Sequence, residues 1–213
     1  MSFTLIDRAT WPREEHFVHY MTDVPCSYSM TVSLDITAVK QAGCRLYPTM
    51  LYLLARTVNA HEEFRTALDT EGNPGVWDVV HPCYTVFHPD TETFSTIWTP
   101  YAADYPTFCA AYAQDLQDFG TVHRFEAKPH TPDNTFSVSM IPWESFEGFH
   151  LHLPKETGDL APIFTLGQYR EEDGRYRIPL AAQVHHAVCD GFHLCRLIGE
   201  LKQLLVQGPP FRL

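Results

Sequence analysis

Two extended runs of β-forming residues near the C-terminus constrain the fold more than any other feature of this sequence. Residues 163–169 and 176–188 flank a Glu-Glu-Asp-Gly turn, a pattern typical of a β-hairpin. Residues 191–206 then carry Leu and Ile at helical spacing, which predicts an amphipathic helix directly after the hairpin. The pattern therefore favours a sheet with helices packed in a layer against it.

The rest of the chain contains the same mixture of elements. Period-two alternation or β-rich composition predicts strands at residues 28–36, 135–141 and 146–153 and two or three more within 71–101. Helical spacing predicts helices at residues 48–64 and 104–119. Because these elements follow no strict βαβ order, we expect an α+β two-layer sandwich, with a mixed β-sheet covered by helices on one face. No repeat or linker divides the sequence, so we expect one domain, residues 1–213.

Charge and composition argue against several classes of function. The net charge of −11 disfavours binding to a nucleic-acid backbone. No stretch approaches about 18 uninterrupted apolar residues, so we expect no membrane span. The N-terminal residues lack a basic region followed by an apolar run, so we expect no signal peptide and a cytoplasmic protein. The six cysteines show no Cys-x-x-Cys spacing, which is consistent with reduced thiols.

The sequence QVHHAVCDGFH, residues 183–193, joins the last predicted strand to the last predicted helix. In the simplest interpretation, Asp190 caps the helix and Gly191 eases a tight turn. A metal site is disfavoured, because neighbouring side chains on a strand, such as those of His185 and His186, point to opposite faces. A thiol nucleophile is also disfavoured, because Cys189 has no Lys or Arg beside it to lower its pKa.

A proton-transfer role is the remaining possibility for this corner. Imidazole titrates near pH ~6.5, so a neutral histidine can accept a proton from a hydroxyl or thiol at physiological pH. Such a base needs a fixed ring and a defined tautomer. Spacing alone does not separate this hypothesis from an ordinary strand-to-helix corner.

A family resemblance favours the catalytic interpretation. His-His-x-x-x-Asp-Gly is the signature shared by chloramphenicol acetyltransferases, dihydrolipoyl acyltransferase catalytic domains and peptide-synthetase condensation domains. Over nearly its whole length the chain resembles the type A chloramphenicol acetyltransferases in particular. The matching motifs are QVHHAVCDGFH, Ser-x-x-Pro-Trp (139–143), Thr-Val-Phe-His (85–88), Glu-Thr-Phe-Ser (92–95) and Arg-x-x-His-Phe-x-x-Tyr (13–20).

The resemblance implies the following roles. His186 is the general base that takes a proton from a hydroxyl of chloramphenicol, and the oxygen then attacks the thioester of acetyl-CoA directly. Ser139 stabilises the oxyanion, and a donor of this kind contributes about 10²–10³ in rate. Asp190 pairs with Arg13 and holds the catalytic loop. Without the resemblance, the alternating pattern predicts only that Ser139 is a serine on the solvent face of a strand.

The resemblance also assigns substrate contacts. The positions that match the antibiotic pocket are Tyr20, Cys26, Tyr28, Phe149, Leu151 and Thr165. The positions that match residues near CoA are Trp143 and Tyr169. Each of these also reads as an ordinary core residue. The family implies a homotrimer with active sites between subunits, acetyl-CoA as a co-substrate, no permanently bound cofactor and no metal.

Three departures from the family pattern concern the acceptor pocket. His19 stands where an aromatic residue is common, and residues 150–160 and 123–134 are unusual. A CoA-dependent O-acyltransferase acting on a different hydroxyl acceptor is therefore the alternative hypothesis. A trimer that binds apolar ligands without catalysis is a third, against which His186, Ser139 and Asp190 argue.

Overall fold

A computed structural model describes residues 2–153 and 159–208 of the chain. Its main sheet has the strand order β2-β10-β8-β7-β5-β6, and β9 pairs with β10 beside this path. The strands are β2 (Ser27–Asp35), β5 (His81–His88), β6 (Thr93–Trp98), β7 (Thr135–Met140), β8 (Ile163–Leu166), β9 (Arg170–Glu172) and β10 (Arg175–His185). β5, β7 and β8 are parallel, and the other pairs are antiparallel. A smaller sheet contains β1 (Phe3–Leu5), β3 (Thr66–Leu68) and β4 (Pro74–Trp77).

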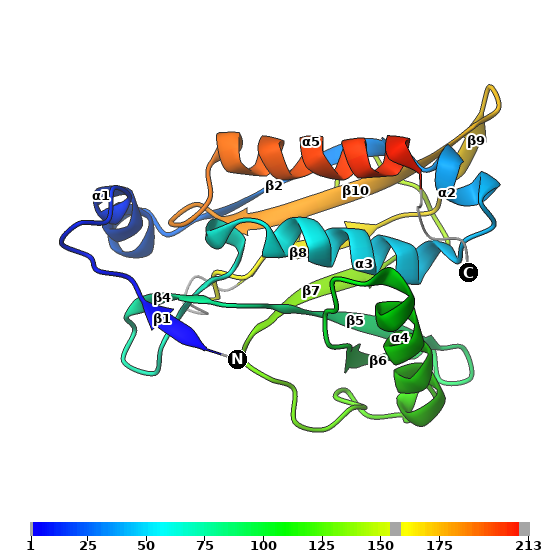
Figure 1. Cartoon of the computed structure of the whole chain (residues 1–213), viewed down its shortest axis with the longest axis horizontal. Helices are drawn as coiled ribbons and strands as arrows, with labels where there is room; N and C mark the ends of the chain where they lie inside the picture. The colour runs from blue at the N-terminus through cyan, green and yellow to red at the C-terminus, as the bar shows by residue number, and fades with distance from the viewer. Residues whose placement is uncertain (1, 154–158, 209–213) are drawn as a thin grey trace.

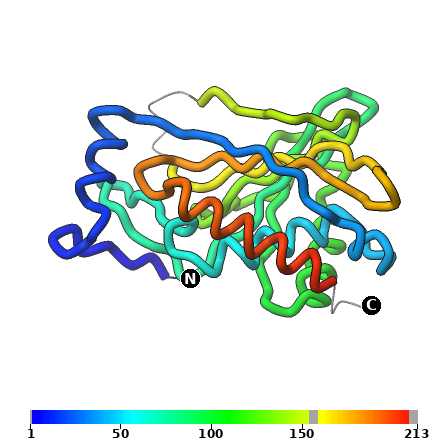
Figure 2. The backbone as a smooth tube through the Cα atoms, turned by 90° about the horizontal axis from the view of Figure 1, so that it is seen from above, coloured from blue at the N-terminus to red at the C-terminus, as the bar shows by residue number. Residues whose placement is uncertain are grey.

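The longer helices form a layer on one side of the main sheet (Figures 1 and 2). They are α3 (Leu46–Asn59), α4 (Tyr105–Phe119) and α5 (Gly191–Gln207). Shorter segments are α1 (Glu14–Val18), the π-helix η1 (His19–Asp23), α2 (Thr37–Gln41) and the 3₁₀ turn η2 (Glu62–Phe64). The predicted α+β architecture, with helices on one face of a mixed sheet, is confirmed. The assignment of residues 1–213 to one domain stays a prediction.

The two faces of the main sheet differ in chemistry. Residues on the helix-covered face are almost fully buried and apolar, among them Leu34, Val138, Phe164, Leu180 and Val184. The opposite face carries hydroxyl groups from five strands, because residues paired across strands share a face. These residues are Ser29, Thr31, Ser33, Thr85, Thr96, Ser137, Ser139 and Thr165. The hydrophobic core therefore lies between sheet and helices, and the hydroxyl-bearing face lies outside it.

The predicted hairpin turn lies between β9 and β10. Glu172 pairs with Arg175, and Asp173 and Gly174 both have positive φ, 51° and 73°. Two central residues of positive φ match the right-handed twist of the flanking strands. The predicted strand at residues 163–169 is shorter, because β8 ends at Leu166 and the chain re-enters the sheet as β9.

The prediction of a strand at residues 146–153 is wrong, because that segment forms no strand. It crosses the hydroxyl-bearing face, on the side opposite the helices (Figure 2). Phe149 N–H donates to Thr31 Oγ1, and the backbone of Leu151 makes hydrogen bonds of 2.9 and 3.1 Å with the side chain of Gln183. An added Cβ at Gly167 would lie 2.8 Å from Phe146 Cε1, so glycine permits the close crossing. The alternation of apolar and polar residues in this segment therefore arises from packing against a sheet face. It does not arise from hydrogen bonding to a neighbouring strand.

Candidate active site

His186 lies in the turn that follows β10, at the end of the sheet nearest α1 (Figure 1). Its backbone N–H donates to Cys26 O at 3.0 Å, which ties the turn to the chain just before β2. Val188 and Cys189 donate their N–H groups to His185 O, which closes the turn. The strand therefore ends at a fixed point, and the backbone at His186 is held from two sides.

Arg13 anchors this turn from a distant part of the sequence. Its Nη2 donates to His186 O, its Nε donates to Ala187 O, and its Nη1 donates to Asp190 Oδ2, all at 2.8–2.9 Å. The Arg13 side chain is mostly buried, whereas that of Asp190 is 36% exposed. A planar guanidinium supplies these three donors in one fixed geometry, which a lysine would not do.

Asp190 is the N-cap residue of α5 and connects that helix to Arg13. His193 Nδ1 lies 2.8 Å from Asp190 Oδ1 and 3.2 Å from its backbone N. Burial by itself would raise the pKa of Asp190, but the hydrogen bond from Arg13 and the charges of His193 and Arg13 lower it overall. The carboxylate is therefore ionised at neutral pH and pairs with Arg13.

Two tyrosines hold the imidazole ring of His186. The Tyr20 ring stacks on it, with centroids 4.0 Å apart and an interplanar angle of 6°. The Tyr28 ring packs edge-to-face with this imidazole, with ring centroids 5.2 Å apart. Tyr20 belongs to the π-helix η1, where Val24 N–H donates to His19 O. Among the described residues, no hydrogen-bond partner reaches the buried His186 Nδ1. Ring contacts therefore set the orientation of this imidazole.

The cysteines near this turn differ from the groups around them. Cys189 is buried, and burial raises the pKa of its thiol to about 12. Burial also raises the pKa of the Cys26 thiol. Neither thiol is ionised near neutral pH, so neither has the thiolate that nucleophilic catalysis needs. The site is equipped for acid–base chemistry.

Ser139 lies on the hydroxyl-bearing face of the sheet, near the end of β7. Its Oγ lies 3.1 Å from Oγ1 of Thr165, its register partner on β8, and Thr165 is 2% exposed. Ser139 follows Val138, which pairs with Tyr84, so Thr85 of β5 lies beside Ser139. Thr85 pairs in turn with Thr96 of β6. The structure thus arranges a row of hydroxyl groups that we call the hydroxyl row: Thr165, Ser139, Thr85 and Thr96.

Aromatic residues border the hydroxyl row. Phe87 pairs with Phe94 in the β5–β6 hairpin, Phe94 contacts Phe125, and Phe87 contacts Trp143 at 4.6 Å. All four side chains are 41–68% exposed. Of these groups, sequence reasoning assigned a role to Ser139, Thr165 and Trp143 only. The alternation of Thr85 and Phe87 within Thr-Val-Phe-His could have placed them on one face.

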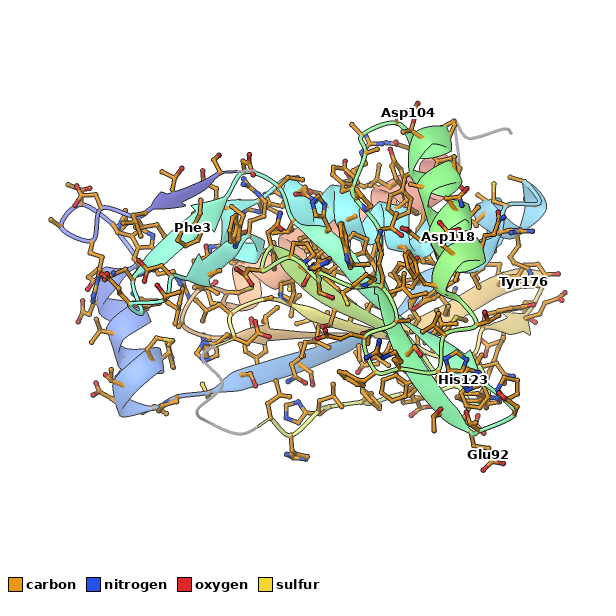
Figure 3. All side chains as sticks on the ribbon, turned by 90° about the horizontal axis from the view of Figure 1, so that it is seen from below. Phe3, Glu92, Asp104, Asp118, His123 and Tyr176 are labelled. Atoms are coloured by element: carbon orange, nitrogen blue, oxygen red, sulfur yellow. The ribbon has the colours of Figure 1, made fainter. Side chains whose placement is uncertain are left out.

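The remaining predicted contacts lie in three places. Phe149 and Leu151 belong to the segment that crosses the hydroxyl-bearing face. Tyr169 lies beyond β8, where its hydroxyl is 3.2 Å from Lys40 Nζ and its ring is 6.0 Å from that of Tyr176. Tyr176 lies at the opposite end of the molecule from Phe3 (Figure 3). Tyr20, Tyr28 and Cys26 surround His186, so the predicted site residues divide into separate groups.

Within one chain, Ser139 and His186 are far apart. Ser139 pairs with Thr165, and Thr165 pairs with Ala181 of β10. His186 lies beyond the end of β10, so strand rise and spacing separate it from Ser139 by about 17 Å along the sheet and about 10 Å across it. Tyr28, the neighbour of His186, pairs with Val184 on the helix-covered face, whereas Ser139 is on the other face. Within the described part of one chain, these two groups therefore do not lie side by side.

Metal ligation and membrane insertion find no support in the described residues. Within residues 2–153 and 159–208, His, Cys, Asp and Glu side chains form no group of three placed to hold a metal ion. No helix in the same part of the chain is both long and apolar enough to span a bilayer.

The sequence is similar to one protein family over most of its length. The family model described as chloramphenicol acetyltransferase matches residues 1–202. A chloramphenicol acetyltransferase of Campylobacter coli is 57% identical, covering 96% of this chain and 99% of the relative. One of Vibrio anguillarum is 55% identical, covering 96% and 95%.

Solved structures share the fold. A chloramphenicol acetyltransferase aligns with a TM-score of 0.83 at 22% identity, covering 96% of this chain and all of the other. The dihydrolipoamide acetyltransferase of Azotobacter vinelandii aligns with a TM-score of 0.66 at 19% identity, covering 90% and 85%.

Proposed function

The chain belongs to the chloramphenicol acetyltransferase family, and on that premise we propose that it transfers the acetyl group of acetyl-CoA to a hydroxyl of chloramphenicol. The observation that carries this proposal is the fixed turn of His186, whose imidazole is stacked on Tyr20 and whose backbone is held by Arg13. An imidazole fixed in this way suits removal of a proton from a hydroxyl. The family match supplies the identity of donor and acceptor.

The proposed reaction is a direct transfer. Neutral His186 takes the proton of the acceptor hydroxyl as its oxygen forms a bond to the thioester carbonyl carbon. The resulting tetrahedral oxyanion accepts a hydrogen bond from Ser139, whose own position is fixed by Thr165. The C–S bond then breaks, and the proton on His186 passes to the CoA thiolate. No acyl-enzyme forms, which is consistent with the raised pKa of the Cys189 and Cys26 thiols.

We propose that each active site lies between two subunits of a homotrimer. One subunit contributes the His186 turn, and its neighbour contributes Ser139 and the hydroxyl row. The separation of Ser139 from His186 within one chain supports this arrangement. So does the buried His186 Nδ1, which has no hydrogen-bond partner in the described part of one chain.

Substrate positions follow from this arrangement. The aromatic groups beside the hydroxyl row, Phe87, Phe94, Phe125 and Trp143, suit the aromatic ring of the antibiotic. Tyr169 and the Lys40 ammonium lie toward the far end of β7 and β8, and a cation there suits the phosphates of CoA. Acetyl-CoA is a co-substrate in this scheme, no cofactor is permanently bound, and the protein acts in the cytoplasm.

One assay tests the function. The purified chain is incubated with acetyl-CoA and chloramphenicol, and a thiol reagent reports free CoA. We expect chloramphenicol-dependent CoA release. Release with other alcohols but not with chloramphenicol would support the alternative acceptor, and binding of chloramphenicol without turnover would show a catalytically silent protein.

A mixing experiment tests the shared site. The variants His186→Ala and Ser139→Ala are each expected to be inactive. When they are unfolded together and refolded at equal concentrations, we expect about a quarter of wild-type activity, because random assembly in a cyclic oligomer pairs the two intact residues at about one interface in four. Activity no higher than that of the separate variants would disprove a site built from two subunits.

A further inference from the structure

His185, the first histidine of the motif, has its own defined interaction inside the catalytic turn. Its Nδ1 accepts a hydrogen bond of 3.2 Å from the backbone N–H of Ala187. The bond spans His186, so it fixes the peptide units on both sides of that residue. An acceptor at Nδ1 requires the neutral ring with its proton on Nε2.

This bond matters because the tyrosine rings orient the His186 imidazole, whereas the backbone of the turn sets where that imidazole lies. Within the described residues its Nδ1 has no hydrogen-bond partner, and Tyr20 and Tyr28 contact only the ring. The position of the imidazole therefore depends on the backbone of the turn. A base displaced by about 1 Å loses up to 10²-fold in rate.

Four groups face or neighbour His185. Asp159 attracts the charged form of its ring, and His186 repels it. Ser27, its partner on β2, is neutral, and Arg13 binds the next two carbonyl groups of the turn. Burial is the largest influence and lowers the pKa of His185, so the neutral ring predominates at physiological pH. A protonated ring would point a second donor at the Ala187 N–H.

We propose that His185 is a positioning residue for the acetyl transfer, whose neutral ring closes the turn that carries His186 and opens it on protonation. The inference rests on the proposed function, in which His186 is the base. It gives the His-His pair two separate tasks: His186 exchanges the proton with substrate, and His185 sets where that exchange occurs. The enzyme should then lose activity in acid through two protonations.

The first test needs only the wild-type protein. kcat/KM is measured against pH with chloramphenicol, with circular dichroism at each pH to show that the protein stays folded. Protonation of His186 alone gives a slope of about one for log(kcat/KM) against pH, and a second protonation raises the slope to about two at lower pH. A slope of about one throughout the folded range would overturn the proposal. If the wild-type protein released no CoA with chloramphenicol at any pH, the proposed function itself would be wrong.

Substitutions test the acceptor atom. In His185→Asn, the amide oxygen can accept the Ala187 N–H as Nδ1 does, since Asn commonly accepts from the N–H two residues on. We expect it to keep kcat within about three-fold and to show a slope of about one in acid. His185→Gln places its oxygen near the position of Nε2, and His185→Leu has no acceptor. Both should lower kcat about ten- to a hundred-fold with KM nearly unchanged.

His81 provides the matched control. His81 is buried at the start of β5, remote from the catalytic turn, and its Nδ1 likewise accepts a backbone N–H, that of Tyr101 at 3.0 Å. Burial also lowers the pKa of His81. His81→Asn should keep the acid slope of about two. Equal activity of the Asn, Gln and Leu variants at position 185, or loss in Asn with rescue by Gln, would show that the Nδ1 bond is not what matters.

Discussion

The turn of His186 and the hydroxyl row around Ser139 are built in opposite ways. Arg13, Cys26 and His185 all bind the backbone of the turn, so its geometry is set within one chain. The hydroxyl row lies on a sheet face without covering helices, where the Ser139 hydroxyl contacts the hydroxyl of Thr165. The first region is held by several backbone hydrogen bonds, whereas in the second Thr165 is buried and Ser139, Thr85 and Thr96 are partly exposed. The difference is consistent with the proposal that a second subunit completes the row.

The largest effect should come from removing the base. His186→Ala removes the group that accepts the hydroxyl proton but no hydrogen bond that holds the turn, since Arg13 and Cys26 bind its backbone. We expect kcat to fall about 10²–10⁴-fold with the fold intact, measured by CoA release and thermal unfolding. Gln117→Ala, at an exposed residue of α4, is the control and should keep full activity. An active His186→Ala enzyme would place the base elsewhere.

Ser139→Ala should have the next largest effect. It removes a donor that acts on the oxyanion in the transition state, so we expect kcat to fall about 10²–10³-fold with KM nearly unchanged. Steady-state kinetics for both substrates measures this split. Ser33→Ala changes an exposed serine on the same sheet face and should be silent. A rise in KM alone for Ser139→Ala would contradict the oxyanion role.

Arg13→Lys should distinguish positioning from chemistry. Lysine keeps the charge but cannot make the three directed hydrogen bonds to Asp190, His186 and Ala187. We expect about a ten-fold loss of kcat together with a loss of about 1–3 kcal/mol in unfolding free energy, measured by denaturant titration at fixed protein concentration. Arg8→Lys, at an exposed ion pair with Glu14, is the control. Unchanged stability with lost activity would give Arg13 a direct role in the reaction.

The smallest effect concerns the pH dependence of the Arg13–Asp190 pair. The pKa of Asp190 is lowered in the folded protein, so its contribution to stability is full above the unfolded value of about 3.9 and is lost as pH falls through that region. We therefore expect the stability advantage of wild type over Asp190→Asn to shrink between about pH 5 and pH 3. Denaturant titrations across that range measure it. If the stability advantage of wild type over Asp190→Asn grew as the pH fell, the pKa of Asp190 would be raised and not lowered in the folded protein.

Much of the fold follows from local patterns in the sequence. Alternation in residues 28–36 and 135–141 predicted β2 and β7, and the turn before Arg175 predicted the β9–β10 hairpin. The same alternation failed at residues 146–153, because a segment lying on a sheet face buries alternate residues as a strand does. Period two reports which side chains are buried, and it does not show where the backbone hydrogen bonds are made.

The sequence by itself determined the groups available for catalysis: an imidazole at a strand-to-helix corner, an N-cap aspartate and a serine in an alternating strand. Motif resemblance paired Asp190 with Arg13, but composition and spacing could not, because 177 positions separate them. Only the tertiary structure decided that Arg13 also binds His186 O and that Thr165 contacts Ser139. It also decided that Tyr28, the neighbour of His186, lies on the opposite sheet face from Ser139. These relations depend on strand order and register, which join distant segments through contacts that no local pattern records.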